Sequence, residues 1–492
     1  MPLPTEAAPT PTLFVDLDGT LIDGDLLHES LAGAVRQDLG VLFRVPFWVA
    51  KGRVELKLRL AELDSVEVET LPYRQDVLGF LREEKLTGRR IVLATASHRA
   101  LAEKVAAHLK CFDAVIATDG ENVKGLTKLK LIRRHLSEQG EGESFEYMGD
   151  SRADEPIFGA SVGYFVVGSR KFGGIEAVQR RRFDSGRRLG SKVAGVLKLI
   201  RPHQWAKNAL IFVPVLAGQR ILDLATVGSA TLAVVVFSLL ASSVYVFNDL
   251  LDLSSDRRHH RKRLRPLASG RVSIVEGVVL GMGLLVVAAG LGVATLPAVF
   301  VAWAGVYFVV STLYSVVLKR KLLVDVLCLA ALYTLRILAG GAATGIVVSH
   351  WLLAFSMFMF LSLAFVKRYT ELAMALEGAK GRVLDSRGVK ASGRGYFEVD
   401  LDLIRSVGPT AGYLAVLVLA LFVSSPEVAT NYRTPTYLYG LCPVVLYWVT
   451  RVWFLAQRRE LHDDPVVFAL GDRHSYVVAL LCAAILLVAK FL

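Results

Sequence analysis

The alternation of apolar and polar residues divides this 492-residue chain into two parts near residue 168. In the first part, short apolar runs are separated by stretches of helical periodicity, a pattern typical of strands alternating with helices. These runs lie at residues 13–15, 91–94 and 145–148. From residue 201 onward, the apolar runs reach the ~20 residues that a helix needs to cross a bilayer. We therefore predict an α/β domain with a parallel sheet at residues 1–168 and an all-α membrane domain at residues 201–492.

The membrane domain contains nine apolar segments of this length, centred near residues 214, 236, 284, 307, 333, 358, 417, 446 and 483. Lys and Arg gather in alternate loops. The loops at 249–272, 319–321, 367–407 and 451–474 contain 22 of them, whereas the intervening loops contain Arg220 and Arg433. Loops rich in Lys and Arg face the cytoplasm. We therefore predict a multi-pass protein of the inner (plasma) membrane whose N-terminal domain lies in the cytoplasm.

A strongly basic stretch, residues 169–200, connects the two domains. Its apolar content is too low for a core, so we predict a linker along the anionic cytoplasmic leaflet. The net charge of +12 indicates anionic lipid and phosphorylated substrates, and not nucleic acid, because no basic surface lies free of the membrane. The four cysteines are widely spaced, which predicts neither a disulfide framework nor a zinc site. The first twelve residues have no pattern of a signal peptide.

The end of the second apolar segment is unusual, because YVFNDLLDLSSDRRHHRKRLRP (residues 245–266) changes abruptly from apolar to acidic and then to basic. With 3.6 residues per turn, its three aspartates fall within about 60° of each other on one helix face. Carboxylates so placed repel each other unless a cation lies between them, and oxygen ligands suit Mg²⁺. The six basic residues between Arg257 and Arg265 would then hold the phosphates of a diphosphate. A solvated juxtamembrane charge run is the alternative. We expect these polar residues to continue the helix of Tyr245: Asn248, Asp249, Asp252 and Asp256.

In the N-terminal domain, polar clusters follow the predicted strands. DLDGT follows the first, Thr95 ends the second, Lys128 lies in the first turn of a helix, and GDSRAD at residues 149–154 follows the third. Ligands gather at the carboxyl ends of parallel strands, so we expect one site. A carboxylate at such a position can accept a phosphoryl group. This order of motifs resembles the haloacid dehalogenase (HAD) superfamily of phosphohydrolases across nearly the whole domain.

The resemblance implies a role for each of these residues. Asp16 would be the nucleophile, and Asp18 the general acid and then the base. Asp150 would complete a Mg²⁺ site with Asp16 and the backbone carbonyl of Asp18, and Asp154 would support it. An inactive domain kept for regulation is the alternative.

Thr95 and Lys128 would hold the phosphoryl oxygens, with Ser97 as an alternative to Thr95, and Lys124 is expected on the surface. Helical periodicity between residues 21 and 91 predicts a small cap. Within it, LFRVPFWVAKGR at 42–53 mixes large apolar and basic residues. We favour a cap core packed on the sheet for this stretch over a contact with a partner or a membrane.

The nine segments, with NDxxDxxxD after the second, resemble the UbiA superfamily of intramembrane transferases. A finer resemblance, covering residues 201–492, is to the branch that makes polyprenyl-phosphoryl phosphoribose. The segments that carry it are RPxQWxKN at 201–208, NDxxDxxxDRxHxxKxxRP at 248–266, YSxxLK at 314–319, KRYTEL at 367–372 and DDPVVFALGDR at 463–473. One departure is His260, where that branch usually has Pro.

That branch transfers 5-phosphoribose from phosphoribosyl diphosphate to a polyprenyl phosphate. The resemblance implies that Asp249, Asp252 and Asp256, with Asn248, form the catalytic Mg²⁺ site, which would give one Mg²⁺ site in each domain. Trp205 is expected as an interfacial anchor. The expected phosphate or substrate contacts are Arg201, Lys207, Asn208, Tyr245, Asn248, Arg257, Lys262, Arg265, Lys319, Arg336, Lys367 and Arg368. For Arg336, eleven residues after Asp325, a substrate contact and a structural ion pair are both open.

The prenyltransferase branches carry a second aspartate-rich motif, and here the corresponding loop, KRKLLVDV, has only Asp325. We therefore predict a Mg²⁺-dependent transferase of phosphoribose to polyprenyl (decaprenyl) phosphate. Its fused phosphatase would remove the 5-phosphate, for synthesis of cell-wall arabinan precursors. A prenyltransferase with a regulatory HAD domain is the alternative. A homo-oligomer is left open, as are the roles of the 378–395 loop and of the patch formed by Asp463, Asp464, Asp472 and Arg473.

Overall fold

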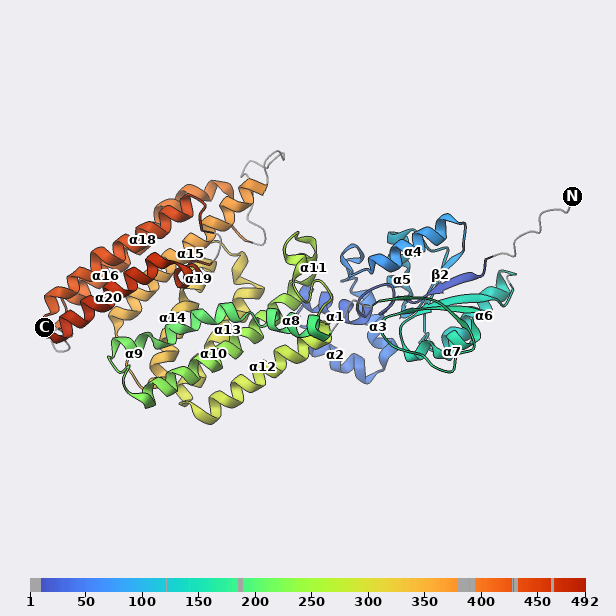
Figure 1. Ribbon diagram of the computed structural model, residues 1–492, viewed down its shortest axis with the longest axis horizontal. Helices are drawn as coiled ribbons and strands as arrows, with labels where there is room; N and C mark the ends of the chain where they lie inside the picture. The colour runs from blue at the N-terminus through green and yellow to red at the C-terminus, as the bar shows by residue number, and fades with distance from the viewer. Residues whose placement is uncertain are drawn as a thin grey trace. The chain divides into compact units, whose positions relative to one another are not determined.

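The computed structural model describes residues 10–120, 122–140, 142–184, 189–378, 389, 394–426, 428, 432–461 and 464–492 (Figure 1). These residues form two compact units. The first consists of Met1–Ile200 and Val246–Leu280, and the second of Arg201–Tyr245 and Gly281–Leu492. The acidic motif at residues 248–256 therefore belongs to the same unit as the N-terminal domain, although the sequence assigns it to the membrane domain.

A six-stranded parallel sheet organises the first unit. In the order β3-β2-β1-β4-β5-β6, its strands are β3 (Ala114–Thr118), β2 (Ile91–His98), β1 (Thr12–Val15), β4 (Phe145–Gly149), β5 (Gly163–Val167) and β6 (Val178–Phe183). Leu13 pairs with Ile91 on one side of β1 and with Glu146 on the other. The apolar run of β1 is fully buried, because Leu13 and Val15 pack into a core on one face of the sheet and Phe14 into a core on the other. The predicted parallel sheet is confirmed.

Helices connect the strands of this sheet. The crossover helices are α4 (Gln75–Leu86), α5 (Arg99–Leu109), α6 (Leu126–Glu138) and α7 (Glu155–Ala160). As predicted, the insert after β1 is helical, with α1 (Leu26–Gln37), α2 (Val41–Ala50), α3 (Arg53–Glu62) and η1 (Val68–Thr70). A small core of Ala34, Val41, Leu56 and Leu60 holds α1, α2 and α3 together. These three helices form the cap of the domain.

The predicted linker at residues 169–200 is wrong in part. β6 pairs with β5 in this stretch, so the sheet continues past residue 168, and α8 (Leu189–Leu199) follows. Only Phe183 of β6 is buried, where it packs against Phe80. An edge strand needs backbone pairing on one side only, and exposed Arg side chains along it discourage pairing with another chain. Its basic composition therefore does not exclude a strand.

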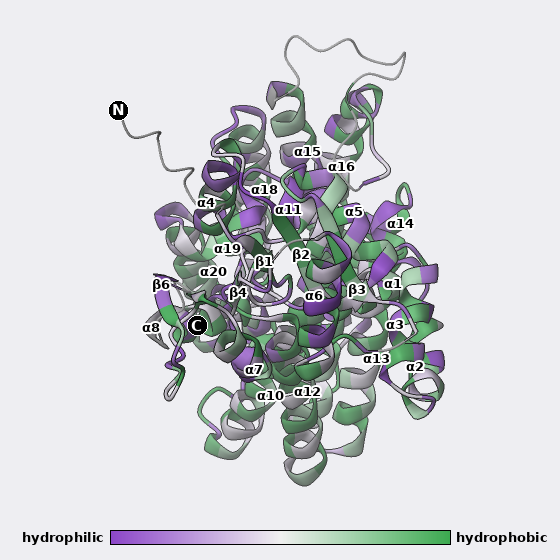
Figure 2. Cartoon of the chain, turned by 90° about the vertical axis from the view of Figure 1, so that its right-hand side faces the viewer, coloured by the Kyte–Doolittle hydropathy of each residue, from purple (hydrophilic) through white to green (hydrophobic). Residues whose placement is uncertain are grey.

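Long apolar helices account for most of the chain after residue 224, and Figure 2 shows the hydrophobic colouring of several of them. Among the described residues, eight are long and apolar enough to cross a membrane. They are α10 (Leu224–Leu251), α12 (Ile274–Thr295), α13 (Ala298–Val316), α14 (Val324–Thr344), α15 (His350–Gly378), α16 (Leu401–Val423), α18 (Leu441–Gln457) and α20 (Arg473–Phe491). The most apolar window of α14 is 72% buried, the largest share of the eight, which places α14 inside the bundle.

The predicted span near residue 214 is not a regular α-helix, so the prediction of nine such helices is corrected. It consists of a 3-10 helix, η3 (Pro202–Phe212), and the short α9 (Val213–Ala217). This segment runs beside α14, because Lys207 lies over the ring of Tyr333 and a Cβ on Gly340 of α14 would lie 2.2 Å from the carbonyl O of Ile211. A 3-10 helix rises about 2.0 Å per residue, so each residue of η3 extends the chain further than a residue of an α-helix does.

Candidate active sites

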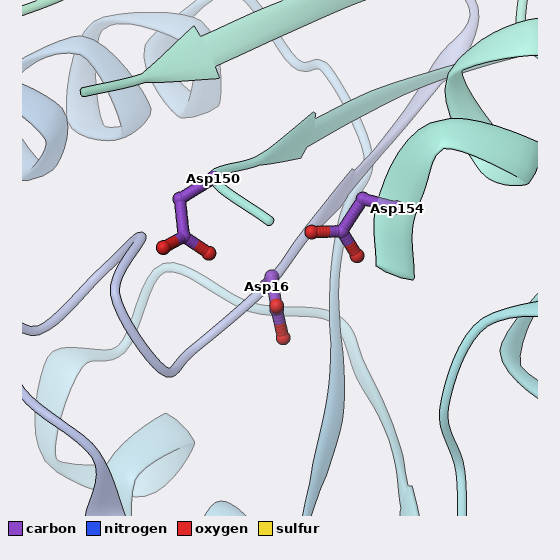
Figure 3. Close-up of side chains that lie close together, drawn as sticks. All are labelled: Asp16, Asp150 and Asp154. Atoms are coloured by element: carbon purple, nitrogen blue, oxygen red, sulfur yellow. The ribbon is translucent and has the colours of Figure 1, made fainter. Parts of the chain in front are cut away.

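Three carboxylates converge at the carboxyl edge of the sheet, and in Figure 3 Asp16 lies between Asp150 and Asp154. Asp16 follows β1, Asp150 follows β4, and Asp154 lies in the short helix η2 (Arg152–Asp154). One oxygen of each lies within 4.8 Å of the others, which within the described ranges is the one such group of three. A Cβ on Gly19, whose φ is +74°, would lie 2.2 Å from Asp150 Oδ2, so glycine is required there. Hard oxygen donors of this kind fit Mg²⁺.

Lys128 balances the charge of these carboxylates, in the position expected for it. Its Nζ lies 2.9 Å from Asp16 Oδ1 and donates a hydrogen bond of 2.9 Å to the hydroxyl of Tyr147. That hydroxyl donates in turn to Asp154 Oδ1 at 2.9 Å. Burial raises the pKa of Asp16 to about 6, although Lys128 opposes the shift. The sequence gives no signal that Tyr147 belongs to this site, because it stands inside an apolar strand and carries no motif.

Asp18 lies beside Ser97, which was the alternative to Thr95. Asp18 Oδ2 accepts from Ser97 Oγ at 2.8 Å, and Oδ1 accepts from the backbone N of Leu26 at 2.7 Å. Thr95 is fully buried, and its Oγ1 accepts from the backbone N of Ser97 at 3.0 Å. Burial raises the pKa of Asp18 to about 7, and the carboxylate of Asp25 adds to this. A carboxyl group with such a pKa both donates and accepts protons near neutral pH.

A cavity of about 650 Å³ joins these residues to the cap, and we call it the catalytic cavity. Lys57 of α3 lies in its wall and donates to the carbonyl O of Ala96 at 2.5 Å and to Asn122 Oδ1 at 2.8 Å. Lys124 also lines the cavity, although it is exposed as expected. Lys57 and Arg53 were missed, and their four-residue spacing on one helix face was the only signal for them. The lining includes Asp16, Asp18, Ser97, Lys128, Asp150, His28, Val49, Arg53, Leu56 and Lys57.

We expect Lys57→Met to raise the KM for a soluble phosphate ester about tenfold and to leave kcat nearly unchanged. The ammonium keeps a third N–H for a bound phosphate, and one charge-assisted contact is worth about this factor. Steady-state kinetics on the full chain test this. Lys130→Met, which removes an exposed ammonium from α6, is the control. An unchanged KM would show that Lys57 only supports the cap.

In the acidic motif, helix α10 ends at Leu251 and α11 (Leu253–Arg258) begins two residues later. The predicted continuous helix is therefore wrong at Asp252, whose φ of −91° and ψ of 7° interrupt it. Backbone hydrogen bonds still run from Asp252 N to Asn248 O at 2.9 Å and from Asp256 N to Asp252 O at 2.8 Å. The helical spacing of the acids is thus preserved across the break.

A cation does lie between two of these acids, and it is Arg265. Its Nη1 is 3.1 Å from Asp249 Oδ1 and 2.6 Å from Asp256 Oδ2, and both carboxylates are buried. Arg257, also expected to bind phosphate, donates two hydrogen bonds of 2.9 and 2.8 Å to Glu29 of α1. Lys262 is exposed in the short helix η4 (Lys262–Leu264). Two acids of the motif therefore pair with a guanidinium, and the Mg²⁺ site expected there stays a prediction.

In the second unit, two lysines expected to bind phosphate meet at one acid. Lys207 Nζ lies 2.7 Å and Lys367 Nζ 2.9 Å from Asp464 Oδ2, and the hydroxyl of Tyr333 donates to Asp464 Oδ1 at 3.0 Å. Asp464, which belongs to the 463–473 patch of the sequence, thus accepts from both lysines and from Tyr333. Asp463 lies outside the described residues, and Asp472 caps α20 by accepting from Ser475.

Arg336 adds a third cation to this group. It lies 5.6 Å from the ring centre of Tyr333, which Lys207 also faces at 5.6 Å. Its Nε donates to Asn208 Oδ1 at 2.9 Å and its Nη2 to the hydroxyl of Tyr307 at 3.1 Å. Both contacts are hydrogen bonds to neutral groups, so neither of them is an ion pair, and the contact with substrate stays a prediction. We call Lys207, Lys367, Arg336 and Asp464 the cationic cluster.

Residues 209–471 match the UbiA prenyltransferase family, and residues 13–158 match the haloacid dehalogenase-like hydrolases. The chain belongs to the UbiA prenyltransferase family. The protein y4nM of Sinorhizobium fredii is 38% identical over 481 residues, which cover 96% of this chain and 90% of that protein. The nodulation protein NoeC of Azorhizobium caulinodans is 37% identical over 281 residues, 57% of this chain and 88% of that protein.

The decaprenyl-phosphate phosphoribosyltransferase of Mycobacterium tuberculosis is 39% identical over 193 residues. These residues cover 37% of this chain and 62% of that enzyme, so less than two thirds of its length is matched. The match lies in the UbiA part of the chain. The predicted families of both domains are therefore confirmed, and the chain is a multi-pass enzyme of the UbiA family with a HAD-like domain.

The start of the UbiA domain packs along α10. Arg201 lies 5.2 Å from the ring centre of Tyr245, so these two expected substrate residues are in contact. Asn208 Nδ2 donates to Ser238 Oγ at 2.9 Å. Trp205, expected as an interfacial anchor, donates from Nε1 to Ser242 Oγ at 2.9 Å. Its indole N–H is therefore used inside the bundle.

Arg368, also expected to contact substrate, is held inside the UbiA domain. Its Nε lies 2.6 Å from Asp325 Oδ2, and its Nη2 donates to the hydroxyl of Tyr314 at 3.0 Å. Asp325 also accepts from the hydroxyl of Tyr396 at 2.6 Å. Both members of the ion pair are fully buried, which indicates a structural role. Lys319 is half-buried in the short helix η5 (Leu318–Arg320), and most of the 378–395 loop lies outside the described residues.

We expect Arg368→Met to lower the free energy of unfolding by about 3–5 kcal/mol, because it leaves Asp325 buried without its cation. Thermal unfolding of the detergent-solubilised chain measures this. Arg405→Met, which removes a half-exposed guanidinium from α16, is the control and should unfold near the wild-type temperature. If both variants unfold alike, the Arg368–Asp325 pair does not stabilise the fold.

Proposed function

We propose that the UbiA domain transfers 5-phosphoribose from phosphoribosyl diphosphate to a polyprenyl phosphate such as decaprenyl phosphate. The identity to the decaprenyl-phosphate phosphoribosyltransferase of M. tuberculosis supports this donor and acceptor. The observation that carries the choice of donor is the pairing of Asp325. Prenyltransferase branches use a second acidic motif in this loop, and here its single acid is occupied by Arg368 and Tyr396. This acid is therefore not free to hold the metal of a prenyl diphosphate.

The acidic motif is assigned to the diphosphate of the donor. Asp249 and Asp256 already share one cation, Arg265, so the local geometry suits positive charge. Mg²⁺ held there, with Asp252 and Asn248, would neutralise the departing diphosphate. Arg265, which already contacts both acids, could then turn to the phosphate oxygens, because a guanidinium can donate two parallel hydrogen bonds to a phosphate.

The cationic cluster is assigned to the phosphate of the lipid acceptor. Lys207 and Lys367 contact one carboxylate, Asp464, and Arg336 adds a third positive charge beside the ring of Tyr333. Charges buried in a bundle are costly unless they are balanced, and an anionic phosphate would supply the missing charge. An oxygen of this phosphate would attack the ribosyl carbon opposite the diphosphate, so that an α donor gives a β product. We also propose that both sites face the cytoplasm, in line with the Lys- and Arg-rich loops.

The HAD domain is assigned a phosphatase activity. Asp16 would attack the phosphorus atom and carry the phosphoryl group, while Asp18 protonates the leaving alkoxide and then takes a proton from the attacking water. Lys128 and Ser97 would hold the phosphoryl oxygens. Mg²⁺ bound by Asp16, Asp150 and Asp154 would stabilise the negative charge of the phosphoryl group.

The two activities would act in sequence. The lipid product of the transfer still carries a 5-phosphate, and its removal gives polyprenyl-phosphoryl ribose, from which cell-wall arabinose donors are made in related systems. The fusion of both domains in one chain supports this order.

A competition between donors tests the transferase assignment. Membranes containing the chain receive polyprenyl phosphate, Mg²⁺ and either labelled phosphoribosyl diphosphate or a labelled prenyl diphosphate. We expect label in the lipid product only from phosphoribosyl diphosphate, because Asp325 cannot complete a second metal site. Incorporation from the prenyl diphosphate alone, into an aromatic or lipid acceptor, would show that the domain is a prenyltransferase.

A further inference from the structure

Helix α2 of the cap exposes large apolar side chains to solvent. Phe43 is 78% and Phe47 71% exposed, one helical turn apart, and Leu42 and Val49 are each 54% exposed on the adjoining strip. The opposite side of the helix packs inside the cap, where Val41 is part of the cap core. The cap-core interpretation of residues 42–53 is therefore wrong for the outer face of this helix. Clustered exposed aromatic residues of this kind mark an interaction surface.

The charges around this face are positive. Residues 41–53 contain three basic residues and no acid. Arg44 lies 5.8 Å from the ring centre of Trp48, Lys51 follows the helix directly, and Arg53 begins α3. The flanking acids, Asp38 and Glu55, are paired with Arg44 and Arg59. An apolar face with an aromatic residue and a basic border matches the boundary between the acyl chains and anionic head groups of a bilayer.

The dimensions of α2 fit a helix that lies in a membrane surface. Ten residues extend about 15 Å, half of the hydrocarbon thickness, so α2 cannot span a bilayer. The same chain carries eight candidate membrane spans among the described residues, so α2 is covalently tethered to a membrane protein. An acidic partner protein would satisfy the basic residues but would not require two phenylalanines exposed to such a degree. A lipid surface satisfies both.

The same helix contributes to the catalytic cavity. Val49, near the end of α2, lines it together with Arg53 and Lys57 of α3 and the nucleophile Asp16. The apolar face and the cavity wall thus belong to adjacent parts of the cap. A cap held in the head-group layer would present the cavity to phosphate esters that are anchored in the membrane.

We propose that α2 inserts Phe43 and Phe47 into an anionic leaflet, and that the HAD domain thereby acts on lipid-linked phosphate esters at the membrane surface. The substrate class rests on the proposed function, whereas the insertion of α2 does not. Contact with a membrane also explains why residues 42–53 combine large apolar and basic side chains, a combination that a cap core alone does not require.

Spin labelling of the full chain tests the insertion. The four cysteines are replaced, a label is placed at Phe43→Cys or, as a matched control, at Leu86→Cys, and the protein is reconstituted in vesicles that contain phosphatidylglycerol. Leu86 is 88% exposed in the same unit, at the end of α4. The label at residue 43 should collide with oxygen and be protected from a water-soluble nickel complex, whereas the label at residue 86 should remain accessible to nickel.

Two results would overturn the insertion. Equal nickel accessibility at both positions would mean that α2 stays in water, and protection of residue 43 from both quenchers would mean that protein covers it, from a second copy or another partner.

For the substrate class, the double variant Phe43→Ser/Phe47→Ser should lose about tenfold in kcat/KM on a lipid-linked phosphate ester, because local substrate concentration is lost. Its activity on a soluble ester should be unchanged, which also shows that it folds. Equal activity of the double variant and the wild type on the lipid would refute the role in substrate access. Insertion at residue 43 without hydrolysis of any lipid by the wild type would refute the proposed phosphatase substrate and leave the membrane contact standing.

Discussion

Asp16→Asn should lower the phosphatase kcat of the full chain by at least ~10³-fold, because an amide is a far weaker nucleophile than a carboxylate. The geometry makes this loss specific. Asp16 lies at the end of a buried central strand, 2.9 Å from Lys128 and within reach of Asp150 and Asp154. An amide of the same shape keeps the packing, so the variant should fold. Release of inorganic phosphate from a soluble ester measures the effect.

The matched control for this variant is Asp76→Asn, which removes an exposed carboxylate from the first turn of α4. It should keep wild-type activity. The Asp16→Asn variant should also keep its transferase activity, because the substitution leaves the acidic motif and the cationic cluster intact. Phosphatase activity within tenfold of the wild type in Asp16→Asn would contradict the assignment of the nucleophile.

Asp249→Asn should lower transfer of phosphoribose to lipid by at least ~10²-fold, because it removes one charge from the group that would hold the metal and the diphosphate. Asp249 is buried and is one of two acids that share Arg265. The remaining Asp256 would keep Arg265 as its partner and would not attract a divalent cation as strongly. Label transferred from phosphoribosyl diphosphate to extractable lipid measures this.

Asp223→Asn is the control for the transferase variant. This acid is exposed immediately before α10, the helix that carries Asp249 at its other end, so it tests whether any loss of charge along the helix matters. It should retain full transfer. The phosphatase activity of Asp249→Asn on a soluble ester should remain, which shows that the variant is folded. Full transfer by Asp249→Asn would remove the acidic motif from the mechanism.

Much of the fold follows from local patterns. The apolar triplet at residues 13–15 predicts the buried centre of the sheet, because only a strand covered on both sides is apolar at every position. The strand β6 could not be predicted from an apolar pattern, since it is an edge strand whose Arg side chains face solvent. The 3-10 conformation of η3 could not be predicted either, because hydropathy does not distinguish a 3-10 helix from an α-helix.

Part of each site can also be predicted. The spacing of Asp249, Asp252 and Asp256 predicts acids on one helix face, and two of them share Arg265; the Mg²⁺ expected there and the phosphate contact expected of Arg265 stay predictions. For the HAD domain, the order of motifs after the strands predicts the carboxylate group of Asp16, Asp150 and Asp154. These predictions succeed because neighbouring positions on one helix or one sheet edge are set by short-range geometry.

The partners of these residues come from distant parts of the chain, and no local pattern names them. Asp464 meets Lys207 across 257 positions, and Glu29 meets Arg257 across 228. Tyr147 looks like any apolar residue of a buried strand until Lys128 is placed beside it. The partner of Arg368 could not be named from the sequence either, because its pairing with Asp325 depends on how α14 and α15 pack.

The most direct test of the account is the mass of the lipid made by the whole chain. Membranes that contain it receive polyprenyl phosphate, Mg²⁺ and phosphoribosyl diphosphate labelled in the ribose. The wild type should yield labelled polyprenyl-phosphoryl ribose without the 5-phosphate, Asp16→Asn should accumulate the same lipid with the 5-phosphate, and Asp249→Asn should yield neither. A wild-type product that keeps its 5-phosphate, or no labelled lipid at all, would contradict the account.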